Sequence, residues 1–142
     1  MEGKVRLAAT ALIYKDGVFE SDLLGVSRKD NSELFGLPGG KVDPGEDTYT
    51  AMVREVFEET GLFVDRAVPL FFREEEGFLA VVYLVTEWHG DVSTSETGKV
   101  DWIDFEVLKR GSFAEYNAKL EEHIAYLGLV YDLRRFYKKN KI

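Results

Sequence analysis

Two hydrophobic periodicities alternate along the chain and predict its strands and helices. Segments 5–14 and 18–27 are rich in β-branched and small apolar residues, and the polar turn between them predicts a β-hairpin. Two more strands are expected over 67–74 and 78–88, on either side of an acidic turn. Four aromatic residues of this second pair are expected in the core: Phe71, Phe72, Phe78 and Tyr83.

Between these two pairs of strands, the spacing changes to that of a helix. The helix is expected to begin at Asp47 or Thr48, either of which can cap it, and to end at Gly61. One side of it carries the residues expected to pack inward, namely Tyr49, Val53, Val56, Phe57 and Thr60. The opposite side carries three acids at i, i+3 and i+4: Glu55, Glu58 and Glu59.

Outside these elements, the chain predicts one more helix and two irregular stretches. Apolar positions recur at helical intervals over 113–137, with an interruption at Gly128, so a terminal helix is expected to pack on the sheet. The Pro38-Gly39-Gly40 segment cannot continue regular structure and lets backbone groups approach a ligand closely. Residues 91–99 form a polar loop that contains Glu96.

The three clustered acids are the first candidate for chemistry. Like charges at i, i+4 destabilise a helix by a few tenths of a kcal/mol, and a divalent cation between Glu55 and Glu59 would remove that cost. Carboxylate oxygens are the ligands that magnesium, manganese and calcium prefer. Acids on a helix are also common as a solvated face, so their spacing alone leaves both readings open.

The full spacing around these acids is more specific. Residues 40–62 read GKVDPGEDTYTAMVREVFEETGL and match every defining position of the Nudix box, at Gly40, Glu46, Arg54, Glu55, Val56, Glu58, Glu59, Gly61 and Leu62. The chain therefore resembles Nudix hydrolases. The resemblance implies an α/β fold, an α/β/α sandwich around a mixed, curved sheet, formed as a single domain over 1–142. The segment VDWIDFEVL at 100–108 fits the strand and short helix that follow in this family.

The same resemblance implies a reaction and a cofactor. Nudix hydrolases cleave a pyrophosphate linkage in a nucleoside diphosphate joined to a further group, with Mg²⁺ or Mn²⁺. The implied metal ligands are the Gly39 carbonyl and the acids Glu55, Glu58, Glu59 and Glu96. Glu55 or Glu96 would be the catalytic base, and the choice between them stays open, as does the number of metal ions. The box holds no Ser, Cys or His that would act as a nucleophile.

Other residues are expected to support the acids or bind the substrate. Arg54 is expected to orient acids through charge-assisted hydrogen bonds, while Glu46 either supports Arg54 or binds metal through water. The resemblance implies substrate contacts at Arg28, Gly39, Gly40 and Asn117, with Asn117 reading a purine edge. His89 and His123 have no spacing that indicates metal binding or nucleophilic catalysis, so both are assigned to the surface or to packing.

Composition narrows the class of protein and its partners. The chain has 142 residues, 45% hydrophobic and 31% charged, which is typical of a soluble globular domain. It has no cysteine and no apolar run of membrane length, so a cytoplasmic protein without membrane contact is expected. The net charge of −8 argues against binding a nucleic-acid polymer and leaves a small nucleotide as the expected partner. Either a monomer or a homodimer fits the sequence.

The substrate is chosen by elimination. The proline that accompanies ADP-ribose hydrolysis in the family is replaced by Phe78, and the tyrosine that accompanies dinucleoside polyphosphate hydrolysis is replaced by Leu79 or Ala80. A nucleoside or deoxynucleoside triphosphate, cleaved to monophosphate and pyrophosphate, is therefore expected. The alternatives are a nucleotide-sugar or ADP-ribose pyrophosphatase, a non-catalytic nucleotide-sensing domain and a calcium-binding surface helix.

Overall fold

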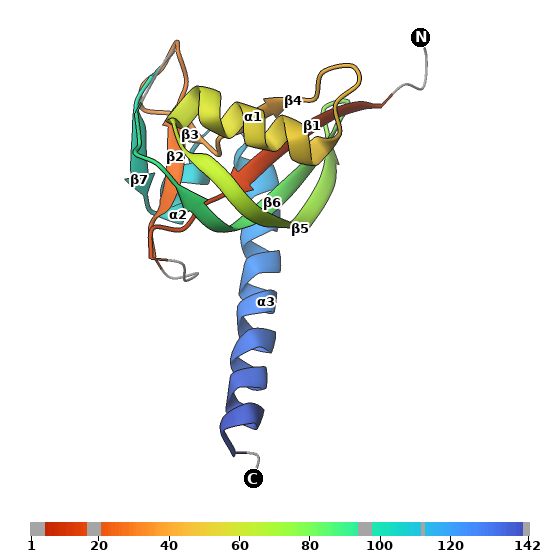
Figure 1. The fold of residues 1–142 in the computed structure, drawn as a ribbon, viewed down its shortest axis with the longest axis vertical. Coiled ribbons are helices and arrows are strands. Elements are labelled where there is room, and N and C mark those ends of the chain that lie inside the picture. Colours follow the sequence, from red (N-terminus) through yellow and green to blue (C-terminus); the bar gives the residue numbers. More distant parts are fainter. Residues whose placement is uncertain (1–4, 17–20, 94–97, 112, 141–142) are drawn as a thin grey trace.

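A computed structural model describes residues 5–16, 21–93, 98–111 and 113–140, with the side chains of 75 and 128–140 left out. Two β-sheets and three helices make up this part of the chain (Figure 1). The first sheet has the strand order β4-β1-β6-β5, and the second has the order β3-β2-β7. The first sheet consists of β1 (Arg6–Leu12), β4 (Gly39–Lys41), β5 (Phe63–Glu75) and β6 (Phe78–His89). The second consists of β2 (Leu23–Ser27), β3 (Phe35–Gly36) and β7 (Val100–Ile103).

The first sheet is mixed and lies between helices. Strand β1 runs parallel to β6 and antiparallel to β4, while β5 and β6 form a long antiparallel hairpin. Alternate residues of a strand point to opposite faces. Accordingly, Ala9 and Ala11 pack in the cluster that contains Met52 of α1 (Thr48–Thr60), whereas Leu12 packs in the cluster that contains Leu120 of α3 (Ala114–Asn140). This arrangement confirms the predicted sandwich around a mixed sheet.

Within the described residues, the predicted hairpin of 5–14 with 18–27 is present only next to its turn, where the amide of Lys15 donates to the carbonyl of Asp22 and the amide of Leu24 donates to the carbonyl of Ile13. Strand β1 itself belongs to the first sheet and β2 to the second, and an isolated antiparallel bridge joins Tyr14, which follows β1, to Leu23. The reason is that both edges of β1 are already occupied, by β4 on one side and β6 on the other. Strand β2 pairs instead with β3 and β7. The prediction of a hairpin over 67–74 and 78–88 is confirmed, and β5 begins earlier than expected.

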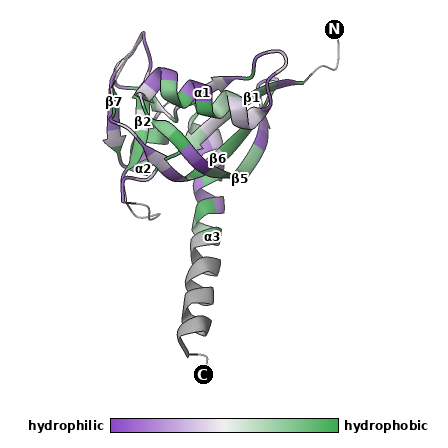
Figure 2. Ribbon diagram, viewed as in Figure 1, coloured by the Kyte–Doolittle hydropathy of each residue, from purple (hydrophilic) through white to green (hydrophobic). Residues whose placement is uncertain are grey.

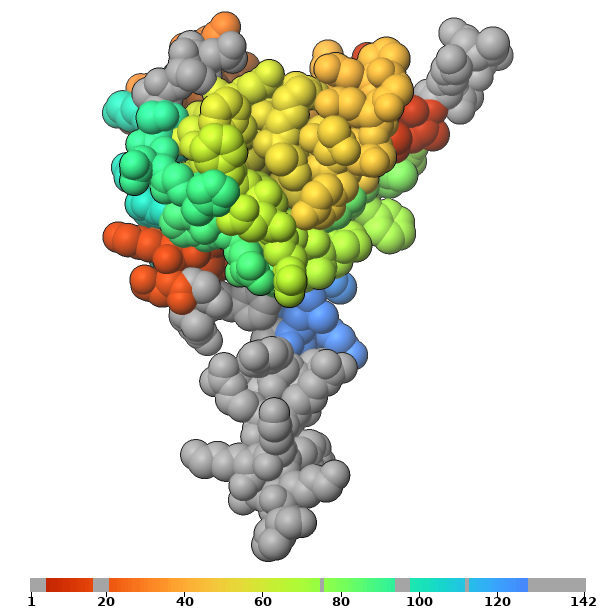
Figure 3. All heavy atoms as spheres, viewed as in Figure 1, coloured from red at the N-terminus to blue at the C-terminus, as the bar shows by residue number. Residues whose placement is uncertain are grey.

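Helix α1 is rotated relative to its predicted packing face. Its buried residues are Ala51, Met52, Val56 and Thr60. Two aromatic residues expected in the core are exposed, since 46% of Phe57 and 37% of Tyr49 remain accessible. Phe57 stacks instead on the ring of Phe63, with centroids 4.7 Å apart. Figure 2 shows hydrophobic and hydrophilic residues alternating along α1, and Figure 3 shows that α1 forms much of one face of the molecule.

The aromatic residues of the β5–β6 hairpin are not all in the core. Tyr83 is buried, as predicted, and Phe71 and Phe78 are half-buried. Phe72 is 70% exposed, so its predicted place in the core is wrong. Phe71 and Phe72 differ in burial because neighbouring side chains of a strand face opposite directions, and β5 lies at the edge of its sheet.

The C-terminal half contributes two helices. The short helix α2 (Phe105–Leu108) follows β7, as the resemblance implied. Helix α3 continues through Gly128 without the predicted interruption, and its N-terminal part buries Tyr116, Leu120 and Ile124 against the sheet. Its C-terminal part projects away from the body of the molecule (Figure 1). Among the described residues, no helix is both long and apolar enough to cross a membrane.

Candidate active site

Helix α1 is fixed at both ends, which sets the direction of its acids. At its start, the side chain of Asp47 accepts a hydrogen bond of 2.7 Å from the amide of Thr50, confirming Asp47 as the cap. This hydrogen bond lowers the pKa of Asp47. At its end, Gly61 adopts φ 81° and donates its amide to the carbonyl of Phe57, as predicted for a helix stop.

Two of the three acids are directed at strand β4. The amide of Gly39 donates a hydrogen bond of 2.8 Å to Oε1 of Glu59. A Cβ atom added at Gly40 would lie 2.9 Å from the carboxyl carbon of Glu55, so the missing side chain leaves the room that this carboxylate occupies. Gly39 itself adopts φ 147°, and a Cβ there would collide with the carbonyl of Ala9. The two glycines therefore bring backbone and carboxylates together.

Arg54 links four acids into one network. Its guanidinium donates to both carboxylate oxygens of Glu46, at 2.8 and 3.0 Å, to Glu55 at 2.8 Å and to Glu58 at 3.0 Å. It also lies 3.4 Å from Asp43. The hydrogen bond from Arg54, assisted by one from the amide of Asp43, lowers the pKa of Glu46 to about 2. The hydrogen bond with Glu46, and after it the one with Glu55, raises the pKa of Arg54.

This network bears on the two roles that were open for Glu46. Both of its oxygens are engaged by Arg54, and Oε1 also accepts the amide of Asp43 at 3.0 Å. The geometry therefore matches support of Arg54 rather than binding of a metal. Arg54 makes the hydrogen bonds to acids that were expected of it. It does not line the pocket that opens beside α1 and is described below.

The predicted metal ligands are only partly brought together. Among the described residues, no three His, Cys, Asp or Glu side chains form a group that could hold a metal ion. Glu55 and Glu58 share Arg54, while Glu59 is turned toward Gly39. The chemistry of the donors fits a hard divalent cation, because all three are carboxylates of one helix that lies beside the two glycines of β4. The metal site stays a prediction, and Glu96 lies outside the described residues.

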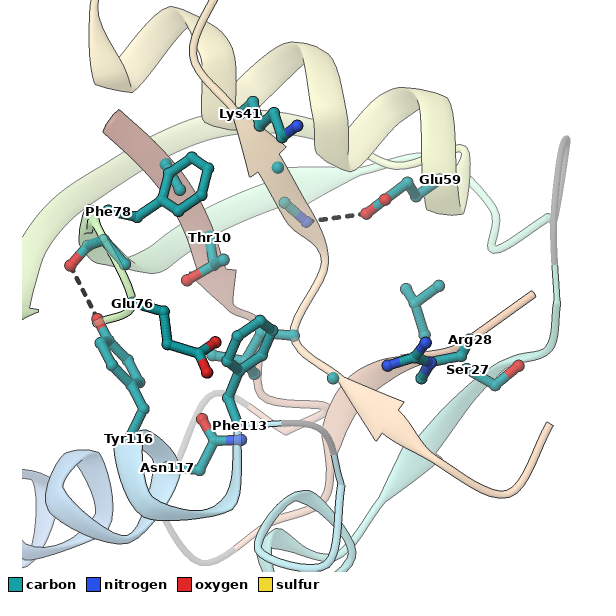
Figure 4. A pocket seen from close by; sticks show the side chains of 17 residues that line it. Thr10, Ser27, Arg28, Lys41, Glu59, Glu76, Phe78, Phe113, Tyr116 and Asn117 are labelled. Carbon is teal, nitrogen blue, oxygen red and sulfur yellow. Dashed lines mark hydrogen bonds between the residues drawn. The ribbon is translucent and has the colours of Figure 1, made fainter. Parts of the chain in front are cut away.

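A pocket of about 430 Å³ opens beside these acids (Figure 4). Glu59, Gly39, Gly40 and Lys41 line it where β4 meets α1, and Arg28, which follows β2, also lines it. Elsewhere its wall is formed by residues of β1, β2, β3, β6 and α3, by the turn before β6 and by the residue before α3, including Ala8, Thr10, Glu76, Phe78, Ala80, Phe113, Tyr116 and Asn117. A volume of this size suits a small-molecule ligand. The predicted substrate contacts Arg28, Gly39, Gly40 and Asn117 thus share one pocket, and their roles stay a prediction.

The two predicted side-chain contacts differ in how they are held. Arg28 is half exposed and forms an ion pair of 2.7 Å with Asp30, which raises the pKa of Arg28 and lowers that of Asp30. Asn117 is buried, and its Nδ2 donates a hydrogen bond of 3.2 Å to the carbonyl of Leu108. Burial explains why Asn117 holds one orientation at the pocket wall, whereas Arg28 keeps a water-exposed guanidinium.

Sequence reasoning did not assign several of the pocket residues to the site, Lys41, Glu76 and Phe78 among them. Phe78 was assigned to the core but lines the pocket, with the guanidinium of Arg6 4.7 Å from its ring centroid. Glu76 was read only as part of an acidic turn. The signal that would have found it is the Glu-Gly pair itself, because a two-residue hairpin turn normally carries Asn-Gly or Asp-Gly. Both histidines lie as predicted, His89 in an exposed pair with Asp65 and His123 against Phe71.

Comparison with known proteins agrees with the box and the fold. A family model described as the NUDIX domain matches residues 4–124. The chain belongs to the NUDIX domain family. The predicted Nudix fold is also confirmed by a solved structure of MutT, from a study of the Aliivibrio salmonicida and Vibrio cholerae proteins. It superposes with a TM-score of 0.71 and 27% identity, covering 87% of this chain and 99% of that one.

Relatives in sequence carry the names of pyrophosphate-cleaving enzymes. An 8-oxo-dGTP diphosphatase of Haemophilus influenzae is 34% identical over 97 residues, which make up 65% of this chain and 71% of that protein. An ADP-ribose pyrophosphatase of Methanocaldococcus jannaschii is 44% identical over 63 residues, 42% of this chain and 37% of that protein. The prediction of a Nudix pyrophosphohydrolase, acting on a nucleoside diphosphate linkage, is confirmed at the level of the family.

Proposed function

We propose that this Nudix hydrolase cleaves nucleoside or deoxynucleoside triphosphates to the monophosphate and pyrophosphate. One observation carries the proposal: the same pocket is lined by Glu59 and the β4 glycines and by Phe113 and Asn117. A phosphate chain would lie against the first set and a base against the second. The Haemophilus relative named as an 8-oxo-dGTP diphosphatase supports the choice of a triphosphate.

Glu55, Glu58, Glu59 and the Gly39 carbonyl would hold a divalent cation, Mg²⁺ or Mn²⁺, together with Glu96. When bound, such a cation offsets negative charge on the phosphate oxygens and lowers the pKa of a bound water. Carboxylates suit this role because they are hard oxygen donors that leave coordination positions for water and substrate phosphates.

The chain's own residues hold these carboxylates in place. Glu46 fixes the guanidinium of Arg54 through two hydrogen bonds, and Arg54 in turn restrains Glu55 and Glu58. The amide of Gly39 restrains Glu59. Arg54 is thus a positioning residue, since it acts through the acids rather than on the substrate. Glu55 or Glu96 would accept the proton of the attacking water. In either case one carboxylate takes up one proton.

On the same side of the pocket as Glu59 and the β4 glycines, Arg28 and Lys41 would contact phosphate oxygens, whereas Asn117, on the other side, would contact the base. Lys41 lies on β4 and lines the pocket beside Gly40. Two cations here would offset some of the repulsion between a triphosphate and the acids of α1. We also propose one domain over residues 1–142, a cytoplasmic location, and a monomer or homodimer.

A product assay tests the proposal. Nucleoside triphosphates, oxidised nucleotides, ADP-ribose and nucleotide sugars are incubated with Mg²⁺ or Mn²⁺, and each product is identified. We expect pyrophosphate from triphosphates. Glu58→Gln should lower turnover about 100-fold or more and leave the melting temperature nearly unchanged, because its pair with Arg54 is exposed. Full activity of this variant would contradict the metal-ligand role of Glu58.

A second candidate is hydrolysis of ADP-ribose or a nucleotide sugar. The Methanocaldococcus relative named as an ADP-ribose pyrophosphatase favours it, although the match covers 37% of that protein. Release of AMP and ribose 5-phosphate from ADP-ribose, with no pyrophosphate from triphosphates, would select this alternative. A domain that binds nucleotide without cleaving it would yield no product from any member of the panel.

A further inference from the structure

The turn between β5 and β6 has an unusual residue at its tip. Glu75 pairs with Phe78, so the loop consists of Glu76 and Gly77 alone. Both have positive φ, 50° for Glu76 and 84° for Gly77, which is the signature of a type I′ turn. Glu76 is the one non-glycine residue with positive φ among the described residues. Asn or Asp normally takes this position, because its short polar side chain can hydrogen-bond to the local backbone and so offset the steric cost of the left-handed region.

The side chain of Glu76 explains why this cost is tolerated. It lines the same pocket as the box residues, and Figure 4 shows its carboxylate pointing from the turn toward Phe113 and Asn117. The left-handed backbone therefore directs an acid into the pocket, where an asparagine would reach less far. A backbone outlier that places a charged group in a ligand site indicates a functional constraint.

The surroundings of Glu76 define what it could contact. Phe113 and Phe78 present aromatic rings to the pocket, which suits a flat heterocycle. Asn117 is fixed by its hydrogen bond to the carbonyl of Leu108. Figure 4 shows Glu59 and Arg28 on the opposite side of the pocket from Glu76. Glu76 thus faces the position of a base whose phosphates lie against β4 and α1.

We propose that Glu76 is a specificity-determining residue that selects a guanine-type base. An ionised carboxylate only accepts hydrogen bonds, and its two oxygens match two parallel donors. Guanine offers such a pair, the ring N1–H and the exocyclic amino group. Adenine and cytosine offer an amino group beside a bare ring nitrogen, whose lone pair faces the acid. Thymine and uracil offer one N–H between two carbonyls. This inference rests on the proposed function, because it assumes that a nucleotide occupies the pocket.

Three variants separate this role from that of an ordinary surface acid. Glu76→Gln keeps the length of the side chain and removes its charge. Glu76→Asn shortens the side chain and restores the preferred Asn-Gly turn, so it should raise the melting temperature by about 2–4 °C. Glu74→Gln is the matched control, since Glu74 is an exposed acid of the same hairpin that does not line the pocket.

The experiment compares dGTP with dITP, which lacks the exocyclic amino group. We expect the wild type and Glu74→Gln to favour dGTP by about 10-fold in kcat/KM, the size expected for a partly solvated charged hydrogen bond. In Glu76→Gln and Glu76→Asn, the ratio should fall close to one. Loss of a negative charge alone would strengthen binding of both nucleotides equally and leave the ratio unchanged. An unchanged ratio in both variants would overturn the inference.

Binding of the monophosphates distinguishes failure of this inference from failure of the proposed function. Calorimetry should show that the wild type binds dGMP more tightly than dIMP by a similar factor, and that Glu76→Gln does not. If triphosphates are not cleaved but this difference is present, only the proposed triphosphatase activity is overturned. If triphosphates are cleaved and the difference is absent in the wild type, the role of Glu76 is overturned.

Discussion

Replacing Gly40 with alanine should lower kcat and leave the stability of the fold nearly unchanged. The added Cβ would lie 2.9 Å from Cδ and Oε2 of Glu55 and 3.1 Å from Oε1, whereas ordinary contact begins at 3.4 Å. The carboxylate must therefore shift by about half an ångström or more, which also strains its 2.8 Å hydrogen bond with Arg54. Since misplacing a reacting group by about 1 Å can cost 100-fold, we expect kcat to fall about 10- to 100-fold.

Stability should respond differently. Gly40 does not have positive φ, so alanine can adopt its backbone conformation. Alanine also reduces the conformational entropy of the unfolded chain, which is worth about 0.4–1 kcal/mol, and the clashing atoms are the end of a flexible side chain. We therefore expect a melting temperature within about 3 °C of the wild type, measured by differential scanning calorimetry.

A double-mutant cycle with Glu55→Ala checks the mechanism. In that background the clashing carboxylate is gone, so Gly40→Ala should cause no further loss of kcat. The assay is pyrophosphate release from a nucleoside triphosphate at saturating substrate. If Gly40→Ala lowers kcat by the same factor whether or not Glu55 is present, displacement of Glu55 is not the cause and the reasoning fails.

Three further predictions follow from the network around α1. Arg54→Lys should lower kcat about 10-fold or more at unchanged KM in steady-state assays, because lysine cannot replace a fork that contacts three acids. In Glu46→Gln, the melting temperature should fall less steeply with decreasing pH than it does in the wild type. The pKa of Glu46 is lowered to about 2, so its contribution is present above pH of about 4.5 and is lost as the pH falls toward 2, which thermal melts over this range would detect. Asp47→Ala should cost about 1 kcal/mol through loss of the cap, lowering the melting temperature but not kcat.

Local patterns in the sequence predicted the parts of the site that depend on local structure. The cap at Asp47, the stop at Gly61 and the hairpin of β5 with β6 follow from neighbouring residues, and the structure has all of them. The spacing of the Nudix box also predicted the family correctly, because nine specified positions in one segment are hard to match without common descent. These features depend on few contacts between distant residues.

Features that depend on distant partners could not be predicted in the same way. The pairing of β1 is decided by β4 and β6, which lie far along the chain, so the predicted pairing with 18–27 is absent from β1 and, in the described part of the chain, present only at residues 13–15. The predicted burial of Phe57 was wrong because α1 buries Ala51, Met52, Val56 and Thr60 instead, and this choice of face depends on contacts with other elements. Glu76 enters the pocket only through the long hairpin that carries it there.

The most direct test of the account is the position of a manganese ion. Crystals grown with Mn²⁺ and a non-hydrolysable nucleoside triphosphate analogue would locate it by anomalous scattering. The account predicts a peak within coordination distance, about 2.0–2.4 Å, of carboxylate oxygens of Glu55, Glu58 or Glu59, with phosphate oxygens beside it. A peak elsewhere in the molecule, or phosphates bound away from α1 and β4, would contradict it.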